Sequence, residues 1–261
     1  MAGVDLNLDY TTDIDFTSSS SLSVQKNTVI REKLSASNLD IVSQTPSWLF
    51  AVRNATVNGY HKDENGLRYY SFDNDIVIQG SFGSLTVLKN EILKCNDIAC
   101  DNVSIFYTFE RSIMIDAFAV DLSGFIYFSV AHATVINGLS VFPADIVQLE
   151  LGLNNYTLAV NSQYPINGLV MGINKNIDAI SKLSEIGGTG YFISFKDEGC
   201  FTGTPTICFN NISIIFIDNS TSTAVEPFVS PSYFGTYENP VNLNSLTITV
   251  PSDLIFKNSF E

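Results

Sequence analysis

The strongest constraint on the fold of this chain is the stretch from Val103 to Ile173. It consists of six runs of apolar, β-branched and aromatic residues, separated by single turns. Residues 122–143 contain no Asp, Glu, Lys or Arg. A run of this kind is either the centre of a β core or a membrane span, and the rest of the interpretation depends on which of the two it is.

The polar residues inside the run favour β strands over a membrane helix. A spanning helix needs about 20 predominantly apolar residues, and residues 125–142 approach that length. They are interrupted, however, by Ser129, His132, Thr134, Asn137, Gly138 and Ser140. Asn137-Gly138 is a strong hairpin signal because both residues tolerate positive φ. The sequence therefore predicts two buried strands joined at Asn137-Gly138, and no membrane segment.

Strand-like segments continue along the rest of the chain, with turn signals at about 8–12 residue spacing. This predicts an all-β, mainly antiparallel fold, either a β-sandwich or jelly-roll-like, with one or two short helices. The clearest helical pattern is 176–186, where Ile177, Ile180 and Leu183 share a helical spacing and glycines follow. Residues 27–37 form a second candidate. Residues 48–52 read as a strand, and 89–99 as either a short helix or an irregular connection.

Residues 1–25 are predicted to form an extended N-terminal arm, and residues 26–261 the main β domain. Two β subdomains divided near 174–190 are the alternative. The arm alternates apolar and polar residues, as a half-exposed strand does. Such a strand should pair with a sheet edge of its own domain or of a neighbouring subunit, so deleting residues 1–20 should leave a folded core and abolish assembly. The alternating apolar residues are Val4, Leu6, Leu8 and Tyr10.

One internal similarity is visible in the sequence. Residues 50–59 resemble residues 128–138, with one insertion, and both segments end in Asn-Gly. A duplicated β unit would produce such a pair. Nothing after the Asn-Gly aligns, and a repeat needs a sustained period. Chance is therefore the preferred interpretation.

The charge of the chain excludes some partners. Its net charge is −14 and only 13 of its residues are Lys or Arg. Nucleic-acid binding depends on basic residues that neutralise phosphates, so no nucleic-acid partner is expected, nor an anionic membrane surface. Charged residues make up only 15% of the chain, whereas Ser, Thr and Asn are abundant. A surface made polar by hydroxyl and amide groups is typical of extracellular, fibrous or virion proteins.

The cysteines are predicted to be reduced thiols. Residues 1–20 lack the basic and apolar regions of a signal peptide, which predicts a chain made in the cytoplasm. Zinc is disfavoured because structural sites prefer tighter spacing on both sides. Cys200 and Cys208 should face each other across a hairpin turned at 203–205, without bonding. The four cysteines are Cys95, Cys100, Cys200 and Cys208.

No nucleophile, metal, phosphate or dinucleotide motif occurs in the sequence. His132 lies in the apolar run and is predicted to be a core residue, whereas His61 lies in a charged turn and is predicted to be solvated. The acidic groups at 63–66, at 73–75 and at Asp97 with Asp101 are interpreted as Asx turns in preference to calcium ligands. No catalytic residue, metal or cofactor is therefore predicted.

The composition favours a non-catalytic structural component of a virus particle, most plausibly of a bacteriophage: a capsid, collar, tail or decoration protein. Its partners would be copies of itself and other virion proteins. The alternative is a carbohydrate-binding or adhesive β-sandwich module, and a glycoside hydrolase with two carboxylates comes third. Besides the arm, the predicted interface includes the aromatic residues of the 228–240 segment: Phe228, Tyr233, Phe234 and Tyr237.

Overall fold

The structure is a computed structural model of the whole chain. It describes residues 7–12, 16–17, 23–24, 27–33, 38–41, 45–52, 54–121, 123–164, 175–182, 190–202, 206–210, 213–218, 225–229 and 243–249. Almost all of the regular structure in these ranges is β strand, and every pair of neighbouring strands is antiparallel. The predicted all-β, antiparallel class is confirmed.

The described strands form four four-stranded sheets, each ordered below from its inner to its outer strand. The first sheet is β24 (Leu243–Thr249), β1 (Asn7–Thr12), β4 (Ile30–Lys33) and β5 (Asn38–Ile41). The second is β6 (Val57–Lys62), β7 (Arg68–Phe72), β10 (Glu91–Cys95) and β11 (Val103–Thr108). The third is β12 (Ile115–Asp121), β13 (Phe125–Val130), β16 (Ile146–Glu150) and β17 (Asn155–Val160). The fourth is β18 (Ile177–Lys182), β19 (Gly190–Phe195), β22 (Ile214–Asp218) and β23 (Val225–Val229).

Each sheet carries a two-stranded hairpin in the connection between its second and third strands. The hairpins are β2 (Phe16–Thr17) with β3 (Ser23–Val24), β8 (Ile76–Gly80) with β9 (Gly83–Val87), β14 (Thr134–Ile136) with β15 (Leu139–Val141), and β20 (Gly199–Phe201) with β21 (Ile207–Phe209). The one described helix, α1 (Ser47–Phe50), lies between the first and second sheets in the chain. The described chain is therefore a fourfold repeat of one unit.

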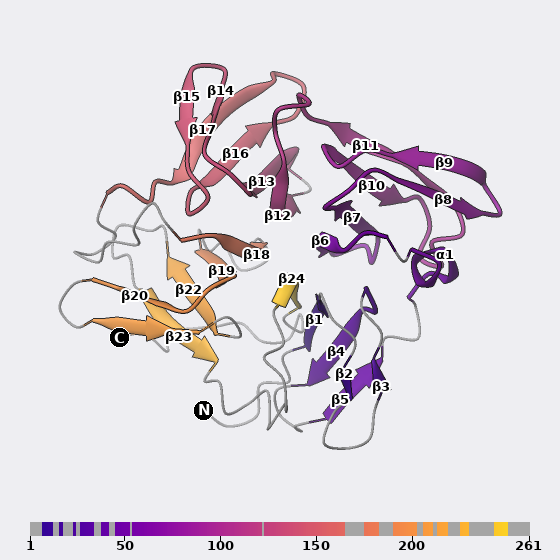
Figure 1. Cartoon of the computed structure of the whole chain (residues 1–261), viewed down its shortest axis with the longest axis horizontal. Coiled ribbons are helices and arrows are strands. Elements are labelled where there is room, and N and C mark those ends of the chain that lie inside the picture. Colours follow the sequence, from indigo (N-terminus) through magenta and orange to yellow (C-terminus); the bar gives the residue numbers. More distant parts are fainter. Residues whose placement is uncertain are drawn as a thin grey trace.

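The four sheets stand around a common axis, with β24, β6, β12 and β18 innermost (Figure 1). Neighbouring inner strands contact each other around the ring, and opposite ones also touch, so the central channel is narrow. The C-terminal strand β24 pairs with β1, which closes the ring. This topology is that of a four-bladed β-propeller. The predicted sandwich is not confirmed, because the sheets do not stack as two layers.

The hydrophobic core lies between successive blades and so is divided into three clusters in the described chain. The cluster of the second blade, around Tyr70, also takes up Trp48 of α1. The second and third blades meet around Phe118 and Phe128, and the third and fourth around Tyr127 and Phe195. Because both faces of a blade are covered, β12 and β19 are buried at nearly every position. This double coverage explains the uninterrupted apolar runs of the sequence.

Each inner strand has a β-bulge at its second residue. In β12, Ile115 pairs with Val130 and Ala117 pairs with Ser129, so that Asp116 between them has no partner in the ladder. The same irregularity leaves out Asn58, Asp178 and Asn244 in β6, β18 and β24. A bulge re-aims the side chain of the extra residue and bends the strand. The fold thus places four bulged residues at one end of the channel.

The bulge also explains why the predicted helix at 176–186 was wrong. Residues 177–182 form the strand β18, and 183–189 lie outside the described residues. An extra residue at Asp178 shifts the two-residue alternation by one. Ile177 and Ile180, three residues apart, therefore face the same core, which mimics the spacing of a helix.

Four other local predictions are corrected. Residues 30–33, within the helix candidate 27–37, form β4, and the segment 89–99, predicted to be a short helix or an irregular connection, contains β10. Residues 48–50 of the predicted strand 48–52 belong to α1. The segment 219–240, whose Ser, Thr, Pro and Gly content predicts a loop, contains β23. At 27–37, 89–99 and 219–240, pairing within a blade overrides the local sequence pattern.

The apolar run at 125–142 forms three strands, β13, β14 and β15, instead of the two buried strands that the sequence predicts, and β14 and β15 are only partly buried. Asn137 and Gly138 have φ of 48° and 82° and join β14 to β15, which confirms the hairpin at this pair. The other Asn-Gly pair does not end a run, because Asn58 and Gly59 lie inside β6. In the part of the chain that the structure describes, no helix has the length and apolarity to cross a membrane.

Three of the four blades repeat one side-chain turn before their third strand. Glu91 accepts a hydrogen bond from the backbone N–H of Leu88, and Asp145 accepts one from Phe142, both at 2.8 Å. Ser213 accepts one from Asn210 at 3.0 Å. Such turns satisfy backbone donors at the strand entrance. Glu91, Asp145 and Ser213 therefore have a structural role in these turns.

The structure joins Cys95 to Cys100 and Cys200 to Cys208 in disulfides, and no free cysteine is found among the described residues. Cys200 and Cys208 do face each other across the hairpin β20–β21, as predicted. The prediction that they and the other two stay reduced was wrong. It rested on the missing signal peptide, whereas the directly opposed strand positions bring the two Cα atoms to 3.9 Å.

Residues 7–12 of the predicted arm form β1, which lies between β24 and β4 in the first sheet. The segment 174–190, where two subdomains were predicted to divide, contains β18 of the fourth blade. The division of the chain into an arm and a main domain, or into two subdomains, stays a prediction.

Candidate functional site

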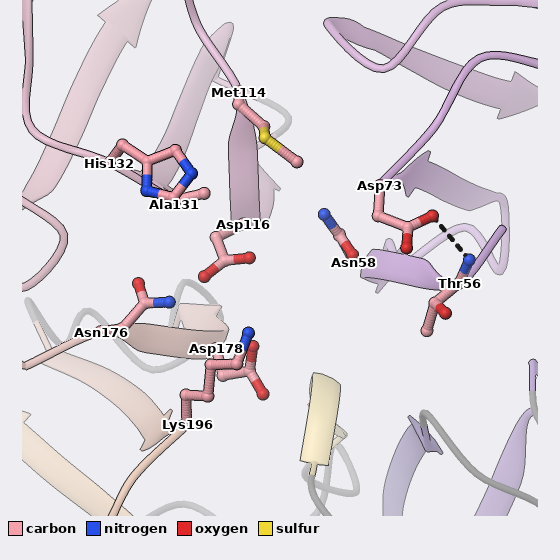
Figure 2. A pocket seen from close by; sticks show the side chains of 10 residues that line it. All are labelled: Thr56, Asn58, Asp73, Met114, Asp116, Ala131, His132, Asn176, Asp178 and Lys196. Atoms are coloured by element: carbon pink, nitrogen blue, oxygen red, sulfur yellow. Dashed lines mark hydrogen bonds between the residues drawn. The ribbon is translucent and has the colours of Figure 1, made fainter.

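A polar pocket lies at the end of the channel where the inner strands begin. It encloses about 350 Å³, which is within the range of small-molecule sites. Figure 2 shows its side chains, which come from the second, third and fourth blades. The lining residues are Thr56, Asn58, Asp73, Met114, Asp116, Ala131, His132, Asn176, Asp178 and Lys196.

The fourfold repeat builds this pocket from three equivalent positions in each of these blades. The first position precedes the inner strand, and the second is the bulge itself. The third follows the second strand, and its backbone N–H donates to the carbonyl oxygen of the first position at 3.0–3.1 Å. These positions are Thr56, Asn58 and Asp73; Met114, Asp116 and Ala131; and Asn176, Asp178 and Lys196.

Asp116 is the most unusual group of the pocket. Its side chain points toward the centre (Figure 2) and only 6% of the residue is exposed. The buried Oδ2 atom has no hydrogen-bond partner among the described residues. Burial raises the pKa of the Asp116 carboxyl, against the opposing effects of the Asn176 hydrogen bond and the charges of Lys196 and His132. A buried acceptor without a partner is rare in folded proteins, and it is often found at functional sites.

The neighbours of Asp116 are mostly polar and partly fixed. Asp178, the equivalent residue in the next blade, is 5% exposed. Asn58 donates from Nδ2 to the carbonyl oxygen of Ile115 at 3.3 Å, which ties the second blade to the third. Asp73 accepts a hydrogen bond from the backbone N–H of Thr56 at 2.7 Å. The bulged side chains are thus held by the blades around the pocket.

The first blade has the equivalent bulge in its inner strand β24. Asn244 lies at the bulge of β24, between Leu243, which pairs with Thr12, and Ser245, which pairs with Thr11. Its side chain is not among those described. By sequence, the two acids occupy neighbouring blades and so do the two amides, in the ring order Asn58, Asp116, Asp178 and Asn244.

Contacts between inner strands join the blades at the far end of the channel. The backbone N–H of Lys62 donates to Thr247 Oγ1 at 3.1 Å, and that of Ile248 to Ser181 Oγ at 3.0 Å. The Lys182 ammonium pairs with Asp121 at 2.8 Å. These contacts connect three neighbouring pairs of blades.

The two histidines have exchanged their predicted environments. His132, predicted to be a core residue, is exposed and lines the pocket. His61, predicted to be solvated, is 7% exposed near the far end of β6. Burial lowers its pKa from 6.5 to about 4, although the negative charge of Asp121 opposes the change. The ring geometry, which the sequence pattern does not reveal, causes both reversals.

Three of the predicted interface residues lie in described strands. Leu8 and Tyr10 belong to β1, and Phe228 belongs to β23. Val4, Leu6, Tyr233, Phe234 and Tyr237 lie outside the described residues. The backbone of β1 pairs within its own sheet, and a role of these residues in subunit contacts stays a prediction.

None of the pocket residues was predicted to form a site, although the sequence carries a signal for the bulged ones. Each inner strand begins with a branched apolar residue, then Asn or Asp, then a small residue. The four triplets are Val57-Asn58-Gly59, Ile115-Asp116-Ala117, Ile177-Asp178-Ala179 and Leu243-Asn244-Ser245. The similarity between 50–59 and 128–138 aligns other positions, because Asn137-Gly138 lies in a hairpin and Asn58-Gly59 in an inner strand.

No protein-family model matches the chain, and a comparison with curated proteins finds no match. Among solved structures, a chain of the nidogen/laminin complex has a TM-score of 0.41 and 9% identity, over 96% of this chain and 99% of that one. A protein of unknown function from Bacteroides caccae has 0.40 and 11%, over 94% and 99%. Virginiamycin B lyase from Staphylococcus aureus has 0.34 and 10%, over 88% and 91%. At these values the site is interpreted from this chain alone.

Proposed function

We propose that the protein is a binding module that captures a small polar molecule at the mouth of its channel. The observation that supports this function most directly is the buried Asp116 Oδ2, which points into the pocket and has no hydrogen-bond partner in the described part of the chain. An acceptor in that position costs stability in the empty protein. A ligand with hydrogen-bond donors would satisfy Asp116 Oδ2 and remove this cost. The relief adds to the free energy of binding in the pocket.

In this proposal the protein binds its ligand and releases it chemically unchanged. No Ser or Cys, the commonest nucleophiles of covalent catalysis, is among the described residues that line the pocket. His132 is exposed at the rim, and the buried Asp116 is held as an acceptor. Binding, rather than bond breaking, is the chemistry that these groups support.

The test is a binding screen with charge-neutralising variants. Ligand-observed NMR with small amines, guanidines, amino acids, monosaccharides and carboxylates should detect at least one class that binds the wild type. Binding should be lost in the Asp116→Asn/Asp178→Asn double variant. It should persist in Glu64→Gln, which neutralises an exposed carboxylate in the turn after β6, away from the pocket.

Two outcomes contradict the proposal. One is that no solute gives a signal that depends on Asp116 and Asp178. The other is conversion of the bound solute to a product, detected by mass spectrometry after incubation, because it would make the protein an enzyme. Recovery of an unchanged ligand supports the binding module.

A role in a virus particle is the second candidate, and its support is the low share of charged residues and the large apolar side chains left exposed on the blades. Those side chains are Val77, Ile98, Val135, Leu153 and Tyr164. Copies of the ring would contact each other through such residues. The oligomeric state of the purified chain, measured by light scattering, tests it: a monomer at all concentrations speaks against an assembly role.

A further inference from the structure

The charge of the pocket selects the sign of its ligand. Among the described residues that line it are three carboxylates, those of Asp73, Asp116 and Asp178, and one ammonium, that of Lys196. The whole chain carries −14, so the long-range field also attracts cations and repels anions. A phosphate, sulfate or carboxylate ligand would enter against both the local and the global charge.

The environment of Asp116 favours a positively charged hydrogen-bond donor over a neutral one. Burial makes the ionised carboxyl unfavourable and raises its pKa. A neutral hydroxyl group would satisfy Oδ2 but would bring no positive charge to the acidic groups of the described lining. A cation with N–H groups supplies a hydrogen bond and an opposite charge together, and such bonds are roughly twice as strong as neutral ones.

Two other kinds of cation fit the pocket poorly. The described residues contain no group of three or more His, Cys, Asp or Glu side chains that could hold a metal ion. No Trp, Tyr or Phe is among the described side chains that line the pocket, and quaternary ammonium ions are recognised by such aromatic faces. The cation should therefore carry N–H donors.

The apolar part of the lining limits what is attached to the cation. Met114 and Ala131 are on the same side of the pocket as Asp116 (Figure 2). The flexible thioether of Met114 adapts to alkyl groups of different shape. A short aliphatic stem suits this side, while the charged end faces the bulged residues.

We propose that the ligand is a small organic cation, a primary ammonium or guanidinium on a short aliphatic stem, whose N–H groups bind Asp116 and Asp178. This inference rests on the proposed binding function and names the ligand class of the same pocket. Asp116 is the anchor, and Asp178 from the next blade is the second acceptor. Because neighbouring blades supply the two carboxylates, the cation bridges them.

Isothermal titration calorimetry with three matched probes tests the inference. Agmatine and n-butylammonium should bind the wild type, whereas butyltrimethylammonium, which has the charge without N–H donors, should bind at least tenfold more weakly. Asp116→Asn should weaken n-butylammonium binding about tenfold or more, as expected for a lost charge-assisted bond. Glu64→Gln should leave it unchanged.

A neutral probe separates this inference from the proposed function. If n-butanol or a monosaccharide binds as tightly as n-butylammonium, and Asp116→Asn abolishes that binding, the pocket is a binding site but the cation inference is wrong. Equal binding of n-butylammonium to wild type and Asp116→Asn also overturns the inference. If no probe of either kind binds in the pocket, both proposals fail. Circular dichroism of each variant confirms that it is folded.

Discussion

At the scale of single residues, the pocket shows how a site can be costly to the fold that carries it. Asp116 is buried, and burial raises the pKa of its carboxyl. The folded chain therefore places this carboxyl where its ionised form is less well solvated than in water. Positions of this kind are where activity and stability oppose each other.

The substitution Asp116→Asn should therefore stabilise the protein at pH 7 while removing ligand binding. The neutral amide keeps the shape of the side chain and removes the buried charge, so we expect the free energy of unfolding to rise by about 0.5–2 kcal/mol. Urea unfolding followed by tryptophan fluorescence measures the change. Glu64→Gln, an exposed neutralisation, should stay within about 0.5 kcal/mol. A less stable Asp116→Asn variant would show that the carboxylate contributes to the fold.

His61 should make the protein sensitive to mild acid. Its pKa is about 4 in the folded protein because it is buried, against an ordinary 6.5. Between these values the unfolded chain binds more protons than the folded one, so stability falls as the pH drops from 6.5 to about 4. The full effect is about 3 kcal/mol.

The test compares stability against pH in wild type and His61→Phe, which keeps a ring but does not titrate. The variant should lose less stability than the wild type between pH 6.5 and 4. His132→Gln, a change at the exposed histidine, should keep the wild-type profile. Parallel profiles of wild type and His61→Phe would contradict the assignment.

At the scale of strands and hairpins, the sequence predicted what local chemistry decides. The strand composition, the turn at Asn137-Gly138 and the facing positions of Cys200 and Cys208 were all readable. The division into four blades was not, because residues far apart in the chain determine it. The helix predicted at 176–186 failed because the bulge at Asp178 changes the spacing of apolar residues. The candidate site was missed because one polar residue near the start of a strand does not indicate a site. The site is formed only where the four inner strands come together.

The two disulfides should differ in accessibility. Cys95 and Cys100 are 0% and 1% exposed, whereas Cys200 and Cys208 lie on the exposed face of a hairpin. A reducing thiolate must reach the sulfur it attacks. Treatment of the folded protein with a low concentration of dithiothreitol, followed by alkylation, should therefore label only Cys200 and Cys208. Peptide mass spectrometry identifies the labelled residues.

Complete reduction after unfolding should then label all four cysteines. If the folded protein reacts at Cys95 and Cys100 first, the accessibility argument is wrong. If alkylation without any reductant labels all four, the cysteines are thiols in solution, as the sequence alone predicts.

At the scale of the whole molecule, the ring depends on one sheet that joins the two ends of the chain. β1 lies between β24 and β4, so it connects the last strand to the rest of the first blade. Every blade packs on its neighbours, and the pocket needs the second, third and fourth blades in register around the axis. Closure of the ring is therefore a condition for the site as well as for the fold.

Deleting residues 1–20 should open the ring rather than leave a complete core, in contrast to the expectation from the sequence. The deletion removes the strand on which β24 and β4 both pair. We expect a lower melting temperature, a broader transition and no binding at the pocket. Deleting residues 1–6 keeps β1 whole and should retain the wild-type transition. A sharp, unchanged transition in the longer deletion would show that the other three blades are sufficient.

The pairing of β1 with β24 also determines how the molecule responds to force. Asn7 is opposite Thr249 and the strands are antiparallel, so the two ends of the described chain leave the sheet side by side. Tension applied between them would pull the strands apart like a zipper, loading one hydrogen bond at a time instead of the whole ladder at once. A tether through the termini should thus yield at low force, beginning at this seam, while the blades farther along the chain are still folded.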